Sequence, residues 1–422
     1  MAFTMGRLVA LLFVVLAATG GDVFAQDTAK PVVVSGDSAR FVTASLLTVS
    51  PGPAIYSVFG HTAIRMQCPS KGLDYCFSFE SELTPGYFFR FFAGECDATF
   101  VARRTDEFLA EFKAEGRGVT QCELNLTPRE KQELWRSLDE DMMEGAHRKF
   151  NLLQNNCTSM ALIKIESVLE SETIEYGAMP PELSLVNGVL LRHCSRRSPW
   201  AQFLFVTFAG SESDKYWETE FRMSPETLVP VLSHAVIRST FSHENGRPVL
   251  VGGERVLLPL RNTYDATLPL TPNRVFGALL ALSFAYALWQ AAGYRRSRGA
   301  GWCGGHGRNG ETGLCRMAWW GLAVVYGVVA LFLLYVTLVS GLFGIHWNWL
   351  LIPFNNVPVV VWLVFRKKKN YPQVYLFYAA VLALFVAVVP WLTTQVMAAH
   401  LLLVGALCLL CVGHYLGWRT AA

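Results

Sequence analysis

Long apolar stretches fill the chain after residue 274 and limit what it can fold into. Because lipid offers no hydrogen-bond partners, a segment that crosses a bilayer must satisfy its backbone internally, as a helix does. Each stretch is long enough to cross the hydrocarbon core. The sequence therefore predicts an all-α transmembrane bundle of about five helices over residues 275–422. The predicted spans are about 275–294, 317–342, 347–365, 372–391 and 396–417.

Basic residues flank these stretches on one side. Arg and Lys accumulate on the cytoplasmic side of membrane proteins, so we expect a multi-pass protein of the bacterial inner (cytoplasmic) membrane with its carboxyl terminus inside the cell. The net charge of +3 partly reflects these residues, and no nucleic-acid partner is expected. They follow the first, third and fifth stretches: Arg295, Arg296, Arg298 and Arg308, then residues 366–369, then Arg419.

Residues 1–25 have the pattern of a secretory signal peptide. Arg7 precedes an apolar run from Leu8 to Ala18, and small residues flank the expected cleavage before Gln26. An uncleaved anchor is the alternative, although the apolar run is short for a span. Export of residues 26–274 to the periplasm agrees with an odd number of later spans.

Strand and helix patterns in the exported part indicate an α+β domain. Apolar alternation predicts strands over 41–50, 56–66 and about 73–79. Thr127-Pro128-Arg129-Glu130 is a capping-box sequence with Pro at the first helical position, and it predicts a helix over about 128–142. The pair Gly252-Gly253 suggests a hairpin.

His61 and Cys157 are the candidate catalytic residues. The alternation around His61 places it on a strand, and apolar residues after Cys157 have helical spacing, so Cys157 would begin a helix. The N-terminus of a helix lowers the pKa of a thiol and offers backbone N–H groups as an oxyanion hole. Such a Cys/His pair performs acyl transfer without a metal, and no cofactor or metal is expected. Taken singly, each residue also fits a structural role in the core.

Six cysteines fall in the exported part, where disulfides can form. A Cys68–Cys76 bridge could join neighbouring strands, and Cys96 and Cys122 are another candidate pair. Connectivity cannot be deduced from the sequence. With Cys157 kept as a free thiol, Cys194 would be left over.

Four ordered segments over about residues 45–165 carry a family resemblance. The segments are Ser45-Leu46-Leu47-Thr48 with Pro51-Gly52 and Tyr56, Phe59-Gly60-His61-Thr62-Ala63-Ile64-Arg65, Leu124-Asn125-Leu126-Thr127 with Glu130-Lys131, and Asn156-Cys157-Thr158. They resemble the Lnb family, the lipoprotein N-acyltransferases of Bacteroides and relatives, and the multi-span carboxyl-terminal part also fits that family.

The resemblance implies a circularly permuted papain-like (NlpC/P60-like) periplasmic domain, with His61 before Cys157 in the chain. The domains would be a signal peptide over 1–25, a Cys/His catalytic domain over 26–170, a periplasmic extension over 171–274 and the transmembrane region. The implied reaction moves a fatty acyl chain from a phospholipid to the α-amino group of the diacylglyceryl-cysteine of a lipoprotein, through a thioester on Cys157. The implied partners are a phospholipid donor, a diacylated lipoprotein acceptor and the bilayer.

The group that orients His61 stays open, because Cys76-Phe77-Ser78 replaces the family's Asn-x-Gly after the histidine. Cys76, Ser78, Glu80 and Asn156 are candidates.

Four residues are predicted to bind substrate. Arg65 shares a strand face with His61 and could bind a phosphate headgroup, or form a structural ion pair. Asn156 adjoins Cys157. His346 and Asn348 are polar residues near the periplasmic end of the spans, where such groups are often functional.

Two other functions use the same residues. A membrane-anchored cysteine peptidase or amidase acting on cell-wall peptide would employ Cys157 and His61 with water in the second step. A non-enzymatic envelope receptor or assembly factor would need Cys157 only for packing.

Overall fold

The computed structural model describes residues 42–421, except for 53, 82–86, 146, 152–153, 178–197, 215–221, 242–245, 262–269, 300–312, 343–344 and 366–372. The predicted signal peptide therefore lies outside the described residues. The chain divides into two units. The first comprises Met1–Phe88, Cys96–Gly177 and Phe221–Tyr264, and the second comprises Phe89–Glu95, Ala178–Glu220 and Asp265–Ala422.

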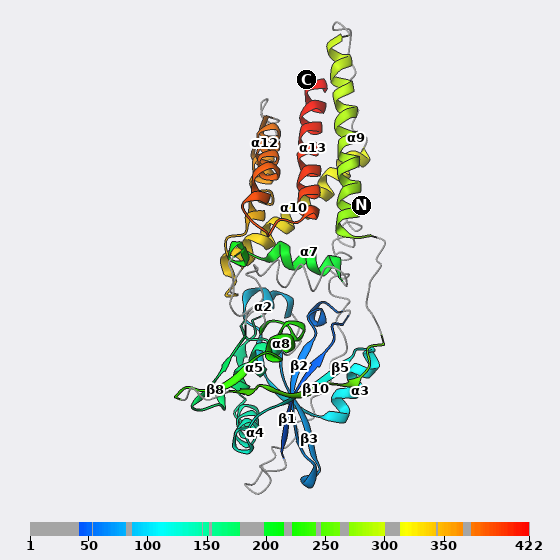
Figure 1. Cartoon of the computed structure of the whole chain (residues 1–422). Coiled ribbons are helices and arrows are strands. Elements are labelled where there is room, and N and C mark those ends of the chain that lie inside the picture. The colour runs from blue at the N-terminus through cyan, green and yellow to red at the C-terminus, as the bar shows by residue number, and fades with distance from the viewer. Residues whose placement is uncertain are drawn as a thin grey trace. The chain divides into compact units, whose positions relative to one another are not determined.

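An antiparallel sheet of seven strands forms the centre of the first unit (Figure 1), in the order β10-β5-β1-β2-β3-β4-β6. A smaller sheet in the same unit has the order β7-β8-β9. The strands are β1 (Thr43–Val49), β2 (His61–Cys68), β3 (Leu73–Ser81), β4 (Asp97–Arg104), β5 (Val119–Leu124), β6 (Arg148–Lys149), β7 (Glu172–Glu175), β8 (Val236–Ser239), β9 (Arg247–Pro248) and β10 (Leu250–Leu258).

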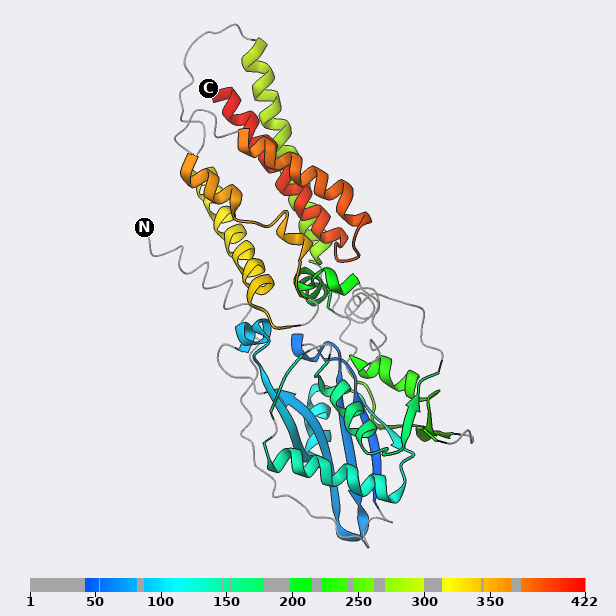
Figure 2. The same ribbon diagram turned by 90° about the vertical axis from the view of Figure 1, so that its left-hand side faces the viewer.

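Helices cover both faces of the large sheet. On one face, Phe108 and Phe112 pack with Leu47, Val49 and Ala63 in a fully buried cluster. On the other face lie α5 (Cys157–Ser167), which contacts β2 and β3, and α4 (Pro128–Met143), which contacts β4 (Figure 2). The helices of this unit are α3 (Thr105–Glu115), α4 (Pro128–Met143), α5 (Cys157–Ser167) and α8 (Pro225–Leu232), while α2 (Tyr87–Ala93) lies where the two units divide.

The predicted helix at 128–142 is confirmed as α4, with its complete capping box. Glu130 N–H donates to the Thr127 hydroxyl over 3.3 Å, and Thr127 N–H donates to the Glu130 carboxylate over 2.7 Å. The strands predicted over 41–50 and 73–79 correspond to β1 and β3. The strand predicted from residue 56 begins only at His61, because a 3-10 turn occupies Ile55–Ser57 and Gly60 has a left-handed φ of 86°.

The hairpin predicted at Gly252-Gly253 is wrong. Strand β10 continues through both glycines and pairs with β5 on either side of them, with register shifts between Val251 and Arg255 and again between Val256 and Leu258. Gly252 adopts a φ of 69°, which permits the irregular pairing. Glycine inside a strand marks a bulge as readily as a turn, and here it marks the bulge.

The predicted disulfide pairs are absent among the described cysteines. Cys68, Cys76, Cys96 and Cys122 are buried, and none of them forms a disulfide with another described cysteine. Cys68 lies opposite Leu73, whereas Cys76 lies opposite Arg65, so the two thiols point to opposite faces of the sheet. Cys96 precedes β4 and Cys122 lies in β5, and three strands separate β4 from β5. Cys194 lies outside the described residues.

The second unit is mainly helical. Its elements are α7 (Pro199–Phe208), a 3-10 turn at Ser211–Asp214, α9 (Pro272–Gly299), α10 (Gly313–Val339), a 3-10 turn η7 (Trp349–Leu351), α11 (Val357–Phe365), α12 (Gln373–Val388), a 3-10 turn η8 (Val389–Trp391) and α13 (Ala398–Ala421). Helices α9 and α13 lie side by side (Figures 1 and 2).

Three helical segments are long and apolar enough to cross a membrane, within the part of the chain that the structure describes. They are Pro272–Arg296, Gln373–Trp391 and Ala398–Gly417. They match the first, fourth and fifth predicted spans. The second predicted span corresponds to α10, whose described apolar stretch is the shorter Tyr326–Val339.

The third predicted span, 347–365, is wrong as a continuous helix. It consists of the turn η7 followed by the nine-residue α11. Asn348 and Asn355 each accept a bond from a backbone N–H two residues later, over 2.8 Å and 3.0 Å, and so begin new turns. Pro353 cannot donate a backbone hydrogen bond.

Candidate active site

Cys157 is the first residue of α5, and its neighbours fix it there. Asn156 caps the helix: its side-chain oxygen accepts from the N–H groups of Thr158, over 2.8 Å, and Ser159, over 2.9 Å. The Ser159 hydroxyl accepts from Asn156 N–H over 2.9 Å and completes a capping box. The thiol therefore lies at the positive end of the helix dipole. Asn156 was predicted to bind substrate, and the structure shows it buried and engaged as the cap.

His61 is the first residue of β2, and Gly60 sets its position. A β-carbon at Gly60 would lie 2.5 Å from the carbonyl oxygen of Val49, so no larger residue fits, whatever its φ. Phe108 and Phe112 of α3 flank the imidazole, with ring centroids 6.3 Å and 6.1 Å away.

A hydroxyl pair fastens α5 to β2 beside the site. Thr62 Oγ1 and Thr158 Oγ1 are 2.9 Å apart and fully buried. These threonines directly follow His61 and Cys157, so the bond aligns the two candidate residues. The structure brings the thiol and the imidazole into a hydrogen bond, and Thr62 N–H also donates to the sulfur.

The electrostatics of the pair favour its charged form. Burial lowers the pKa of His61, but the charge of Cys157, its hydrogen bond and the carboxylate of Glu80 outweigh burial and raise that pKa to about 9. Burial opposes ionisation of Cys157, but the charge and hydrogen bond of His61 and the Thr62 N–H lower the pKa of the thiol. The pair is therefore suited to exist as thiolate and imidazolium, which is the nucleophilic state.

Glu80 is the group that faces the other side of His61. Its Oε1 lies 3.7 Å from His61 Nε2, which leaves Nδ1 available to the thiol. Ser78 Oγ donates to the same carboxylate oxygen over 2.6 Å, and Arg103 pairs with Oε2. Burial raises the pKa of Glu80, but His61 and Arg103 lower it overall, so the carboxylate is ionised.

Glu80 was one of four open candidates for this position, and the structure separates them. Cys76 Sγ contacts Thr105 Oγ1 at 3.3 Å, and burial raises the pKa of Cys76 to about 12. Ser78 donates its hydroxyl hydrogen to Glu80, and Asn156 caps α5. Alternation along β3 indicated that Glu80 shares a face with Ser78, but only the tertiary structure shows which side chain reaches the imidazole.

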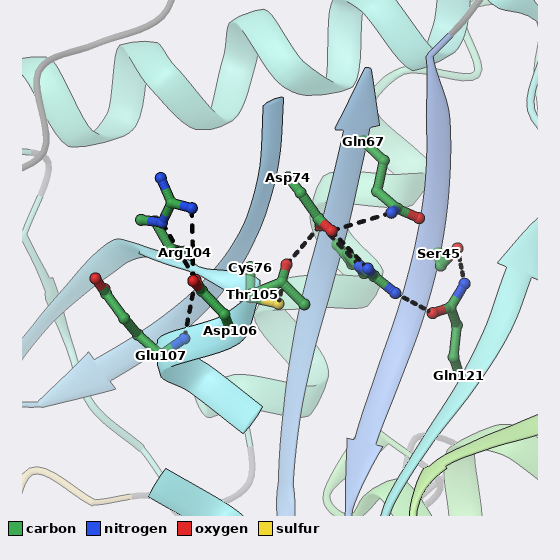
Figure 3. Close-up of polar contacts among 10 residues, drawn as sticks. Ser45, Gln67, Asp74, Cys76, Arg104, Thr105, Asp106, Glu107 and Gln121 are labelled. Carbon is green, nitrogen blue, oxygen red and sulfur yellow. Dashed lines mark hydrogen bonds and ion pairs between the residues drawn. The ribbon is translucent and has the colours of Figure 1, made fainter. Parts of the chain in front are cut away.

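Arg65 was predicted as a headgroup ligand, and the structure places it in a structural cluster. It donates twice to Asp74, over 2.8 Å and 2.6 Å, and once to Gln121, over 2.7 Å. Figure 3 shows Asp74 joined to Gln67 and Thr105 in the same cluster.

His346 and Asn348 belong to the second unit, whereas Cys157 belongs to the first. Asn348 is buried: Nδ2 donates to Thr207 O over 2.7 Å, and Oδ1 accepts from Gln395 Nε2 over 2.7 Å. His346 Nδ1 lies 3.3 Å from Thr337 O. Asn348 therefore joins its own segment to α7 and to Gln395, and His346 contacts the carboxyl-terminal end of α10.

A buried chain of hydrogen bonds continues from there to α13. Thr207 donates its hydroxyl to Phe203 O over 2.5 Å, and His400 Nε2 lies 2.9 Å from the same hydroxyl. His400 Nδ1 accepts from Met397 N–H over 3.1 Å, so Nε2 carries the hydrogen and donates to Thr207. This chain ties α7 to the amino-terminal end of α13.

Metal-ligand geometry does not occur among the residues that the structure describes, which contain no group of three or more His, Cys, Asp or Glu able to hold an ion. The chemistry available at the site is that of an activated thiol, an imidazole and a carboxylate.

Comparison with known proteins identifies the domain that holds this site. Residues 36–177 match the family model described as the Lnb N-terminal periplasmic domain, a range that includes His61, Glu80 and Cys157. No curated protein and no solved structure matches the chain. With the three apolar segments, this domain indicates a membrane-anchored protein. The chain thus contains an Lnb N-terminal periplasmic domain over residues 36–177, followed by apolar helices.

Proposed function

We propose that this protein is an apolipoprotein N-acyltransferase that moves a fatty acyl chain from a phospholipid to the α-amino group of a diacylglyceryl-cysteine. The observation that carries the proposal is the hydrogen-bonded Cys157–His61 pair at the beginning of α5, inside an Lnb domain. Cys157 and His61 are the proposed catalytic residues. Membrane helices in the same chain suit a reaction whose two substrates both reside in a bilayer.

The first half-reaction forms an acyl-enzyme. The Cys157 thiolate attacks the ester carbonyl of the phospholipid, and the sulfur–carbon bond forms. The carbon–oxygen ester bond breaks, and imidazolium His61 gives its proton to the departing lysophospholipid oxygen. The Asn156 cap uses the N–H groups of Thr158 and Ser159. We assign the Cys157 N–H, which the cap does not use, as a donor to the oxyanion.

The second half-reaction transfers the chain to the lipoprotein. The α-amine attacks the thioester carbonyl and gives a proton to His61, and the carbon–nitrogen bond forms. The carbon–sulfur bond breaks, and Cys157 leaves as the thiolate beside the imidazolium. The free enzyme is restored without a cofactor, and the kinetics are ping-pong.

We assign the first unit to a circularly permuted papain-like (NlpC/P60-like) fold. The assignment is supported by a thiol at the beginning of a helix that packs on an antiparallel sheet, and by a histidine on the central strand β2. In this chain the histidine strand precedes the cysteine helix. We place the enzyme in the bacterial inner membrane, multi-pass, with this domain in the periplasm.

A cysteine peptidase or amidase would use the same pair with water in place of the amine. Incubation of the purified full chain with phospholipid alone separates the two classes. The transferase proposal predicts a thioester on Cys157, seen as an intact-mass increase of one acyl chain that hydroxylamine removes and that Cys157→Ser lacks. An unmodified thiol, together with cleavage of muropeptides by the same preparation, would instead establish the hydrolase.

A further inference from the structure

Glu80 lies beside His61 and is held there by its neighbours. Its two carboxylate oxygens have different partners: Oε1 faces His61 Nε2 at 3.7 Å and accepts from Ser78, while Oε2 pairs with Arg103. Arg103 is itself held by Glu111, at 3.2 Å. Side chains of β3, β4 and α3 therefore fix the carboxylate before any substrate binds.

We propose that Glu80 is a positioning residue that orients His61 and keeps it a strong base during the second half-reaction. This inference rests on the proposed function. It makes Glu80 the group that suits the site to an amine acceptor.

The two half-reactions make different demands on His61. In the free enzyme the lowered pKa of Cys157 and the raised pKa of His61 favour the thiolate and the imidazolium, and attack of the thiolate on the ester needs no further proton removal. After acylation Cys157 carries no charge, and its support for the imidazolium is lost. The carboxylate of Glu80 remains as the neighbour that favours a protonated imidazole.

The support that Glu80 gives to a protonated His61 is important because the acceptor is an amine. An α-amino group has an ordinary pKa of about 7.7–8.0, whereas an unperturbed imidazole has one of about 6.5. A base matched to the proton it removes works best. A carboxylate at Nε2 raises the pKa of the imidazole toward that of the amine, which an amide in the same place would not do.

Other charged groups near His61 do not replace Glu80. Cys157 is on α5 and is neutralised by acylation. Glu111, on α3, also acts on His61 through its charge, but its carboxylate bonds to Arg103 and its pKa is raised by burial. Arg103, on β4, reaches His61 only through Glu80.

The test measures the half-reactions separately in the purified full chain. Acyl-enzyme formed from phospholipid is followed by intact mass, and preformed acyl-enzyme is then mixed with a diacylated lipopeptide that has a free α-amine. Glu80→Gln should slow resolution by about tenfold or more while acyl-enzyme formation changes less than about threefold. Glu80→Asp, which keeps the charge, should recover part of the loss. Glu133→Gln, an identical change at an exposed position on α4, is the matched control.

A second readout needs no acyl transfer. The rate at which iodoacetamide modifies Cys157, followed on its peptide by mass spectrometry, reports the thiolate–imidazolium pair across pH. Glu80→Gln should reduce the rate at pH 5–6 relative to wild type, and Glu80→Asp should lie between them, which also decides the matter if Glu80→Gln does not fold. Equal slowing of both half-reactions, or an unchanged alkylation profile, would overturn the role of Glu80. Failure of the wild type to form any acyl-enzyme would instead overturn the proposed function.

Discussion

The hydroxyl groups of Thr62 and Thr158 meet at 2.9 Å inside the protein, 96 positions apart in the chain. Each threonine directly follows a candidate catalytic residue, so this one bond sets the register between the histidine strand and the cysteine helix. Thr158 Oγ1 also lies 3.9 Å from Cys157 Sγ, so the same hydroxyl contacts the reacting thiol.

Removing one partner of this pair should impair the site. Thr158→Val leaves the Thr62 hydroxyl buried without its partner, at a cost of about 1–3 kcal/mol. We expect a lower melting temperature and slower acylation. The double variant Thr62→Val/Thr158→Val should recover part of the stability, because no polar group is stranded. Additive losses in this double-mutant cycle would show that the two hydroxyls do not interact.

The Cys157 thiol should react at a pH where ordinary thiols do not. Its pKa is lowered by His61, so the thiolate persists below the ordinary range and is lost only as the pH falls through the lowered value. His61→Ala removes this support and leaves burial, which raises a thiol pKa, so the alkylation profile should move to higher pH. An unchanged profile in His61→Ala would show that the two side chains are not coupled.

The protonated form of His61 contributes to the stability of the fold, and this contribution depends on pH. The folded pKa of His61, about 9, lies above the ordinary value of 6.5, so its stabilising effect is complete below about pH 6.5. The effect is lost as the pH rises through about 9. The lowered pKa of Cys157 has the opposite effect, because between about pH 6.5 and 9 the folded pair and the unfolded chain bind the same number of protons. We therefore expect the melting temperature of the wild type to fall no more steeply between pH 7 and 9 than that of His61→Phe, and a steeper fall would contradict the thiolate–imidazolium pair.

Gly60 should tolerate no side chain. Its φ is 86°, and a β-carbon there would lie 2.5 Å from Val49 O, so Gly60→Ala must displace the start of β2. We expect a loss of at least about 1 kcal/mol from the backbone conformation alone, and slow alkylation of Cys157 because His61 moves. Gly72→Ala is a suitable comparison, since Gly72 also has positive φ but open space around it. Equal effects at both glycines would exclude a special role for the contact at Gly60.

The bond between Thr207 and His400 should stabilise the second unit independently of the Cys157 site. Thr207→Val leaves the His400 Nε2–H without its acceptor, at a cost of about 1–3 kcal/mol. Thermal unfolding in detergent should show this loss, whereas Thr173→Val, at an exposed position of β7, should change little. Alkylation of Cys157 should be unaffected by either change, and a parallel loss of thiol reactivity would contradict that independence.

Local signals in the sequence predicted the elements that hold the site. The capping box at Thr127 and the helical spacing after Cys157 depend on residues within a turn of one another, so both helices could be placed from the sequence. The bulge at Gly252 and the broken segment at 347–365 depend on the partner strand and on where asparagine side chains find backbone donors. Sequence patterns within those segments do not contain that information.

The site could be predicted only in part, for the same reason. His61 and Cys157 stand in motifs, and the structure brings them together. Glu80 has no motif of its own, and its contact with His61 arises from the pairing of β3 with β2 and β4. Arg65 and Asn156 show the opposite case. Their side chains could bind a ligand, but Arg65 is already paired with Asp74, and Asn156 already accepts hydrogen bonds from the backbone of α5.

The most direct test of the central claim is mass spectrometry of lipoprotein amino-terminal peptides from a host that lacks its own N-acyltransferase. The host would express the wild-type chain or Cys157→Ala, with Cys122→Ala as a control at a buried thiol remote in sequence from the site. The account predicts an amide-linked acyl chain on the diacylglyceryl-cysteine with wild type and Cys122→Ala, and a free amine with Cys157→Ala. Acylated peptides with Cys157→Ala, or free amines with a properly inserted wild type, would contradict it.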